Sequence, residues 1–137
     1  MTALMEVIPT GSYALLVPRN VEEDIDADVT SFWLDGDDLL LQLSSRTRSD
    51  GQQVSAGERM RDRLDMHAYS SVAIVPLEIL GCPDAEAASA VDEDGTHWLF
   101  VYAVWPALAV FVTVTHPSRD VAAPSWAIDA VRSIRLS

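Results

Sequence analysis

Lysine is absent from this chain of 137 residues, and cysteine occurs only once, at Cys82. A single cysteine cannot form an intrachain disulfide, so nothing in the sequence requires an oxidising compartment. The six glycines are scattered and no lysine follows them, which excludes a glycine-rich loop that cradles a phosphate. The first residues lack the basic and apolar segments of a secretory signal, and we therefore expect a cytoplasmic protein.

Basic residues are few in general: 9 arginines stand against 21 acidic residues, giving a net charge of −12. The first 95 residues carry this excess, since residues 1–50 sum to −7, residues 51–95 to −6 and residues 96–137 to +1. Such a field repels nucleic acids and anionic membranes, so we expect neither as a partner. It would speed encounter with a basic protein, although an acidic surface that only keeps the protein soluble also explains the charge.

Signatures of catalysis are missing as well. No Gly-x-Ser-x-Gly turn is present to hold a serine nucleophile. Cys82 stands alone in a turn, where a small packed hydrophobic side chain is its expected role. His67, His97 and His116 lack the i, i+2 or i, i+4 spacing that presents two imidazoles together. We expect no catalytic residue, no metal site and no cofactor.

One acidic stretch has the spacing of a calcium loop at its start. Asp24, Asp26 and Asp28 match the first three ligand positions of such a loop. The sixth position is Val29 and the twelfth is Asp35, where glycine and a bidentate glutamate are required. The stretch is therefore expected to be a solvated run of charge.

The longest apolar segment runs from Thr96 to His116 and contains no acidic or basic side chain between its two histidines. A membrane-spanning helix is disfavoured because Pro106 interrupts the segment and Val, Phe, Tyr, Trp and Thr favour strands. We expect two buried neighbouring strands, 96–104 and 107–115, joined by a tight turn at Trp105 and Pro106.

Ser55 and Glu58 stand at the spacing of a capping box and predict the start of a helix. The helix is expected to run to about residue 67. Arg59, Arg61 and Arg63 within it suggest an anion site, but alternate residues of a helix point in different directions, so we expect no phosphate site.

Turn residues divide the rest of the chain into short elements. We expect extended segments at 1–8, 12–17, 29–34, 38–45, 71–79 and 85–91, a solvated loop or a single helical turn at 20–29, and a closing helix from Pro124 to about Leu136. The length and the 49% hydrophobic content predict one domain, residues 1–137. The order of elements predicts the α+β class, an antiparallel β-sheet flanked by two amphipathic helices.

Four pieces of sequence carry a resemblance to a known family: GSYALLVP, GCPDAEAASAVDEDGTHWLFVYAV, ALAVFVTV and WAIDAVRSIRL. In this order they are similar to the PsbP-like family of small α+β proteins. The resemblance implies a PsbP-like fold and a non-enzymatic role, and it transfers no site residues. The signal peptide and lipid-modified cysteine expected of secreted bacterial relatives are not seen here.

Three hypotheses of function follow. The first is a non-enzymatic cytoplasmic binding protein, such as an immunity or adaptor protein, that engages a basic protein partner. Its partner-binding residues would be Glu22, Glu23, Asp24, Asp26 and Asp28, a second patch of Asp92, Glu93 and Asp94, and an exposed Trp105. The alternatives are a small-ligand-binding protein or enzyme with a pocket between sheet and helix, and a structural subunit of a homo-oligomer. The sequence leaves the oligomeric state open.

Overall fold

The computed structural model describes residues 3–47 and 55–137. These residues form ten strands and two helices, in the order β1 (Leu4–Val7), β2 (Tyr13–Pro18), β3 (Glu22–Ile25), β4 (Thr30–Trp33), β5 (Leu40–Thr47), α1 (Ala56–Asp65), β6 (Tyr69–Ile74), β7 (Asp84–Asp92), β8 (His97–Trp105), β9 (Leu108–His116), α2 (Trp126–Arg132) and β10 (Arg135–Leu136). The helices are short, with ten and seven residues. None of the helices in these ranges is long and apolar enough to cross a bilayer.

The fold is mostly β and its two helices are short, so the predicted α+β class, an antiparallel sheet flanked by two amphipathic helices, is wrong. Two expected non-strand segments form strands instead. The acidic segment predicted as a loop contains β3, and the closing helix ends at Arg132 so that β10 can pair with β2. Both strands depend on pairing with other parts of the chain, which local propensity does not report.

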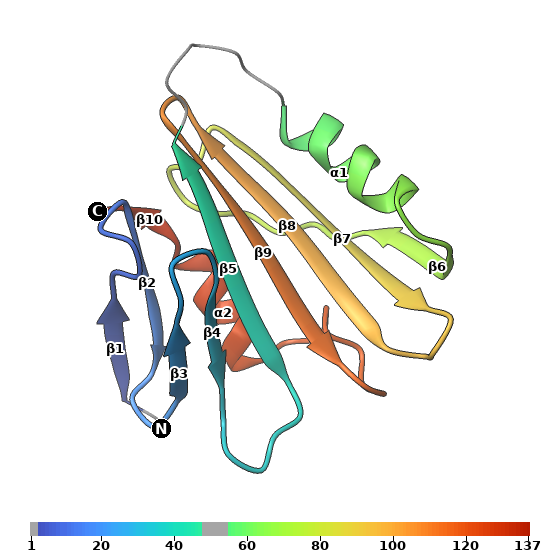
Figure 1. Cartoon of the computed structure of the whole chain (residues 1–137), viewed down its shortest axis with the longest axis horizontal. Coiled ribbons are helices and arrows are strands. Elements are labelled where there is room, and N and C mark those ends of the chain that lie inside the picture. The colour runs from blue at the N-terminus through green and yellow to red at the C-terminus, as the bar shows by residue number, and fades with distance from the viewer. Residues whose placement is uncertain (1–2, 48–54) are drawn as a thin grey trace.

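A seven-stranded antiparallel sheet, in the order β3-β4-β5-β9-β8-β7-β6, is the centre of the molecule (Figure 1). The predicted strand pair is confirmed as β8 and β9, which pair from His97 opposite His116 to Trp105 opposite Leu108. Their tight turn contains Pro106 and Ala107, one residue later than expected. Proline is tolerated there because its missing N–H removes no ladder hydrogen bond.

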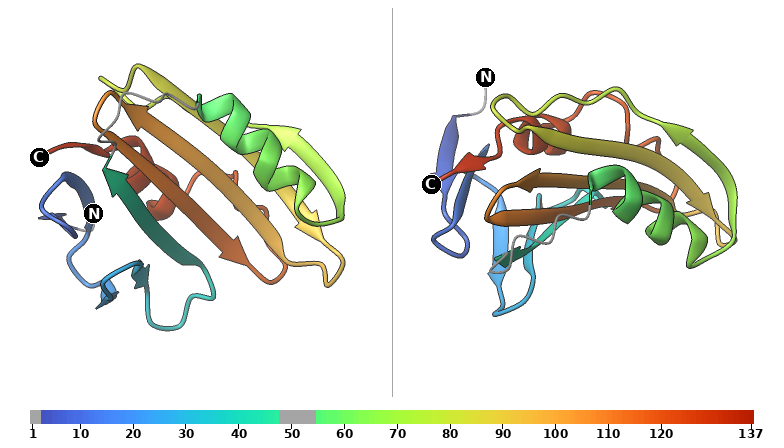
Figure 2. Two further views of the ribbon diagram at one scale, coloured as in Figure 1. Left: turned by 45° about the horizontal axis from the view of Figure 1, so that its top comes forward. Right: turned by 90° about the horizontal axis from the view of Figure 1, so that it is seen from above.

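The two helices cover opposite faces of this sheet (Figure 2). Leu99, Val101 and Ala103 of β8 join the larger core, which also contains the buried side chains of α2. Phe100 and Tyr102, which alternate with them, join the smaller core under α1. Period-two alternation therefore gives β8 two buried faces, so the strand reads as one continuous apolar run.

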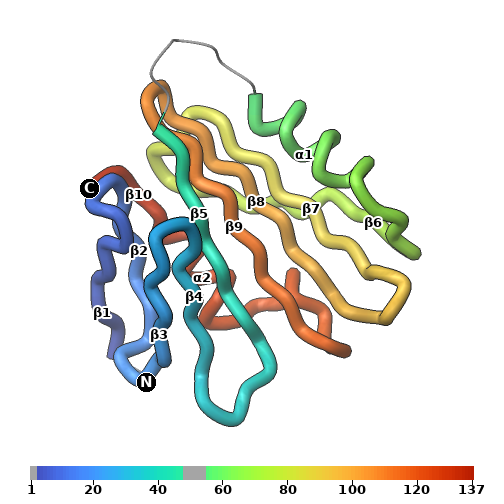
Figure 3. The backbone as a smooth tube through the Cα atoms, viewed as in Figure 1, coloured from blue at the N-terminus to red at the C-terminus, as the bar shows by residue number. Residues whose placement is uncertain are grey.

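A three-stranded sheet, β1-β2-β10, lies at the end of the molecule where β3 and β4 are found (Figure 3). Its central strand contributes Tyr13, Leu15 and Val17 to the larger core, and α2 packs against it. The backbone N–H of Leu16 donates to the Ser133 hydroxyl oxygen at 2.8 Å, which joins β2 to the end of α2. The small sheet thereby closes the face of the large sheet that α2 covers.

Helix α1 begins as the capping residues predict. The Ser55 hydroxyl oxygen accepts a hydrogen bond from the Glu58 backbone N–H at 3.1 Å. A second N–H of the first turn, that of Ala56, donates to the Asp84 carboxylate on β7 at 2.8 Å. The start of α1 is thus attached directly to the sheet.

Candidate functional site

The candidate site lies beside helix α1, on the face of the sheet that α1 only partly covers. The helix packs on β7 and β8, and β9 and β5 continue the same face next to it (Figure 1). Three arginines meet there: Arg46 near the end of β5, and Arg59 and Arg63 on α1. They line a pocket of about 220 Å³, which we call the arginine pocket. Its other lining residues are Ser44, Ser45, Tyr102, Ala109, Val110 and Phe111.

The sequence was expected to hold no anion site because alternate residues of a helix point in different directions. That argument does not apply to the two helical arginines of this pocket. Arg59 and Arg63 are four residues apart, so they share one side of α1. Arg61 between them is exposed and lines no part of the pocket. The i, i+4 spacing was the signal that could have identified the pair, but Arg46 is brought in only by the sheet.

Arg63 is held in a defined position. Its guanidinium carbon lies 4.5 Å from the centre of the Phe111 ring, a cation–π contact. Its Nε–H donates to the Tyr102 hydroxyl oxygen at 3.3 Å. Nε of Arg59 is buried without a hydrogen-bond partner among the described residues. Neither arginine forms an ion pair with a carboxylate in the described ranges, and no carboxylate from those ranges lines the pocket.

The floor beside the arginines is a row of four aromatic rings on β8 and β9. Trp98 and Phe100 have ring centroids 5.6 Å apart with planes at 17°. Phe100 and Phe111 follow at 6.4 Å and 11°, and Phe111 and Tyr102 at 4.5 Å and 24°. Because the planes are nearly parallel, the four rings form one stacked row, which we call the aromatic floor.

A second pocket, of about 390 Å³, lies over the Trp98 end of this floor and shares Arg63 with the first. We call it the aromatic pocket; its lining residues are Arg63, His67, Ala68, Tyr69, Asp92, Glu93, Asp94, Trp98 and Phe100. The Trp98 indole N–H donates to the Asp92 carboxylate at 2.9 Å. This bond is the main reason why the pKa of Asp92 lies below its usual value, and the backbone N–H groups of Thr96 and Asp94 add to the effect.

The predicted acidic residues form two groups that lie apart in the fold. Glu22, Glu23 and Asp24 are exposed on β3, and Asp26 and Asp28 are exposed in the turn that follows it. Asp92, Glu93 and Asp94 lie in the hairpin between β7 and β8, and four strands of the sheet separate β3 from β7. The prediction that Trp105 is exposed is wrong, because its side chain is 5% exposed and belongs to the larger core.

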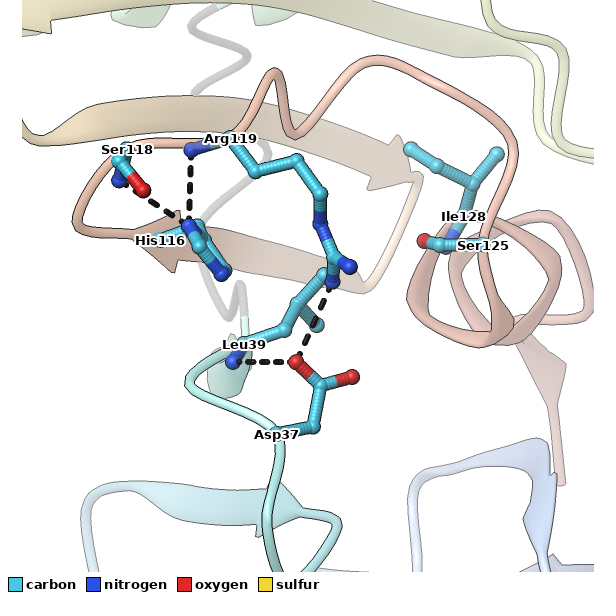
Figure 4. Close-up of polar contacts among 7 residues, drawn as sticks. All are labelled: Asp37, Leu39, His116, Ser118, Arg119, Ser125 and Ile128. Carbon is cyan, nitrogen blue, oxygen red and sulfur yellow. Dashed lines mark hydrogen bonds and ion pairs between the residues drawn. The ribbon is translucent and has the colours of Figure 1, made fainter.

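Two of the three histidines, which were expected to be separate, are neighbours: His97 and His116 lie opposite each other on β8 and β9. His116 supports the turn after β9, where its Nδ1 accepts hydrogen bonds from the backbone N–H groups of Ser118 and Arg119 (Figure 4). The Arg119 side chain then reaches Asp37, 3.2 Å away, before β5. Within residues 3–47 and 55–137, no three His, Cys, Asp or Glu side chains gather closely enough to hold a metal ion.

Cys82 is half-buried and acts locally. Its thiol donates to the carbonyl oxygens of Asp84 at 3.4 Å and Val104 at 3.7 Å. Burial is the main reason why its pKa is raised. A protonated thiol is a poor nucleophile, so this geometry supports the packing role predicted for Cys82.

Comparison with known proteins identifies the fold alone. No protein-family model and no curated protein matches the chain, so membership of the PsbP-like family stays a prediction. A crystal structure from Bacteroides thetaiotaomicron VPI-5482 matches 100% of this chain with a TM-score of 0.69 and 14% sequence identity. The match covers 49% of that chain, so this protein spans about half the length of its structural neighbour.

Proposed function

We propose that this protein is a cytoplasmic binding protein, not an enzyme, and that it holds a small anion in the arginine pocket. One observation carries the proposal: a chain with a net charge of −12 gathers three of its nine arginines around a single pocket. No carboxylate from the described residues neutralises them there. This arrangement corresponds to the hypothesis of a ligand pocket between sheet and helix.

The unbalanced charge is the physical reason for an anion. Guanidinium groups that face one another repel, and a buried charged donor without a partner is unfavourable. A phosphate or sulfate would accept hydrogen bonds from Arg59, Arg63 and Arg46, and hydrogen bonds between charged groups are about twice as strong as neutral ones. Ser44 lies opposite Phe111 on the face that α1 partly covers, so its hydroxyl group can supply a further donor at the wall of the pocket.

Calorimetric titration with inorganic phosphate and with sulfate tests the proposal. We expect Arg59→Gln to weaken phosphate binding by about tenfold or more, the loss typical of a hydrogen bond to a charged group. Arg61→Gln is the matched control, because it removes the same charge from the exposed side of the same helix. Equal effects of the two variants, or no binding of either anion at millimolar concentration, would contradict the proposal.

A second candidate function is binding of a basic protein partner, as an immunity or adaptor protein would do, through β3. The observation that favours it is that β3 ends the seven-stranded sheet and all four of its residues are exposed. A partner strand could pair with the open edge while its cations meet Glu22, Glu23 and Asp24. The same carboxylates would repel one another in a pair of two β3 strands, which disfavours a homo-oligomer formed by this edge.

A synthetic peptide of alternating arginine and valine tests this second candidate. Binding should weaken steeply as salt is raised, and it should be lost when Glu22, Glu23 and Asp24 are replaced by Gln, Gln and Asn. The control replaces Glu93 and Asp94 at the distant hairpin by Gln and Asn. Peptide binding that survives the β3 substitutions, or that ignores salt, excludes this use of the edge.

A further inference from the structure

We infer that the ligand of the two adjoining pockets is a planar aromatic monophosphate, with its phosphate in the arginine pocket and its ring in the aromatic pocket. This inference rests on the proposed anion-binding function and names the class of ligand. Nucleoside monophosphates belong to that class.

The two pockets are parts of one binding surface. Arg63 lines both of them, and the aromatic floor continues from Tyr102 and Phe111 in the first to Phe100 and Trp98 in the second. Small-molecule sites usually have volumes of roughly 300–1,000 Å³. The arginine pocket, at about 220 Å³, is smaller than this range, whereas the two pockets together lie within it. A ligand that fills the site therefore extends beyond the phosphate.

The second pocket offers ring surfaces and few donors. The indole N–H of Trp98 is already bonded to Asp92, so Trp98 contributes its half-buried ring, and no free donor, to the lining of this pocket. Tyr69 and His67 stand edge to face, with ring centroids 6.4 Å apart, and both line the same pocket. A flat ring gains most from such walls, because stacking on aromatic side chains tolerates any planar ring.

The charged residues of the two pockets determine which way round the ligand binds. Arg46 and Arg59 line only the arginine pocket, whereas Asp92, Glu93 and Asp94 line only the aromatic pocket. Glu93 and Asp94 are exposed, and their carboxylates disfavour an anion at this end. They accept hydrogen bonds, so they suit a ring that carries amino groups. The anionic group of the ligand therefore belongs at the Arg46 end and the ring at the Trp98 end.

Titration with four probes tests the inference: adenosine 5′-monophosphate, ribose 5-phosphate, adenosine and inorganic phosphate. We expect the monophosphate of adenosine to bind at least about tenfold more tightly than ribose 5-phosphate, the ratio that stacking of one base supplies. Adenosine should bind more weakly than its monophosphate, because it lacks the group that the arginines hold.

Substitution of Trp98 separates the two parts of the ligand. Trp98→Leu should abolish the preference for adenosine 5′-monophosphate and leave the affinity for ribose 5-phosphate within about twofold, because the arginine pocket is unchanged. Trp98→Phe, which keeps a ring, guards against a folding defect and should retain most of the preference. Trp33→Leu is the control, because Trp33 lies on β4 and lines neither pocket.

The outcomes distinguish the inference from the function on which it rests. Equal affinities for adenosine 5′-monophosphate and ribose 5-phosphate would overturn the aromatic ligand and leave the anion site intact. Failure of all three phosphate-containing probes to bind would overturn the anion site itself. A preference that survives Trp98→Leu and is lost in Trp33→Leu would place the ring elsewhere and would also overturn the inference.

Discussion

At the scale of single residues, Tyr13 shows how burial can leave a polar atom unsatisfied. Among the described residues it is the largest side chain that is completely buried, at 0% exposure, and it lies at the start of β2. Its hydroxyl oxygen has no hydrogen-bond partner among the described residues. Burial raises the pKa of Tyr13 to about 12, because the phenolate cannot be solvated there. The buried ring stabilises the folded state, whereas the buried hydroxyl without a partner destabilises it.

Tyr13→Phe removes this hydroxyl and keeps the ring. We expect the free energy of unfolding at pH 7 to stay the same or to rise by up to about 1 kcal/mol, since a buried donor without a partner is unfavourable. Chemical denaturation measures the change. Tyr102→Phe provides the contrast, because the Tyr102 hydroxyl accepts a hydrogen bond from Arg63 and its loss should destabilise the protein. A clear loss of stability in Tyr13→Phe would show that the hydroxyl has a partner.

The raised pKa of Tyr13 predicts how stability depends on alkaline pH. Below pH 10 the tyrosine is neutral in both states and contributes nothing to the pH dependence. Between pH 10 and the folded-state pKa of about 12, the unfolded state loses its proton first, so the folded state loses stability as pH rises. A shift of two units corresponds to about 2.7 kcal/mol. Tyr13→Phe should lack this part of the decline when unfolding is followed from pH 9 to pH 12.

Individual residues also decide where α2 ends. The sequence predicted a helix to about Leu136, and its buried stripe is formed by Ala127, Ile128, Ala130 and Val131. The Ser133 hydroxyl donates to the Ala130 carbonyl oxygen at 2.6 Å and accepts the backbone N–H of Leu16. Leu16 is 117 positions away in the sequence. The helix therefore ends at Ser133 because of a contact with a distant strand, which the helical periodicity of the sequence does not reveal.

At the scale of elements, the position of α1 depends on the small side chains of β7. Alanine side chains are small, so they let another element approach a strand closely. Ala88 and Ala90 lie in the smaller core with Ala56 and Met60 of α1. Close packing of α1 on β7 places Arg59 and Arg63 beside β9. The geometry of the arginine pocket thus depends on strand residues that do not line it.

Ala88→Leu should force α1 away from the sheet. Ala88 is 0% exposed, and a larger side chain in a packed core costs about 1–3 kcal/mol. Urea denaturation measures the loss, and the affinity for phosphate should fall with it as Arg59 and Arg63 move. Ala73→Leu is the control, because Ala73 is exposed on the edge strand β6 and should have little effect. Full stability in Ala88→Leu would mean that α1 repacks freely.

The strand β3 shows the limit of local sequence signals. Glu22, Glu23 and Asp24 have low strand propensity, and the sequence predicted a solvated loop. They form a strand because Thr30–Trp33 returns beside them and pairs with all four residues of β3. The backbone N–H of Asp26 closes the connecting turn on the carbonyl oxygen of Val29 at 3.0 Å. Their exposure was predicted correctly, and their conformation was not.

At the scale of the whole molecule, the net charge is negative, whereas the arginine pocket of the candidate site is lined by positive charges. The net charge is −12 and the isoelectric point is near 4.3, so the protein is strongly anionic at neutral pH. Acidic side chains occupy the exposed edge strand β3 and the hairpin between β7 and β8. The arginine pocket is a local exception to this field. A ligand anion is therefore held by short contacts and is not attracted from a distance.

Salt should stabilise the folded protein. The acidic surface repels itself, and the screening length falls from about 30 Å at 0.01 M salt to about 8 Å at 0.15 M. We expect the free energy of unfolding to rise over this range, by an amount on the order of 1 kcal/mol. Thermal or chemical denaturation at several sodium chloride concentrations measures the effect. Arg59→Gln should show the same dependence of unfolding free energy on salt, which separates screening from the binding of chloride in the arginine pocket. A fall in stability as salt is raised would contradict the expectation.

The sequence by itself determined the buried strand pair β8 and β9, the capped start of α1, the extended segment at 38–45 that contains most of β5, and the exposure of the acidic residues around β3. These features follow from periodicity, capping chemistry and charge, which act over a few neighbouring residues. Tertiary structure alone decided that β3 and β10 are strands, that Trp105 is buried, and that Arg46 of β5 meets Arg59 and Arg63 of α1. Each of these results depends on pairing or packing between distant parts of the chain, and the energy of such contacts is not encoded in any local stretch of sequence.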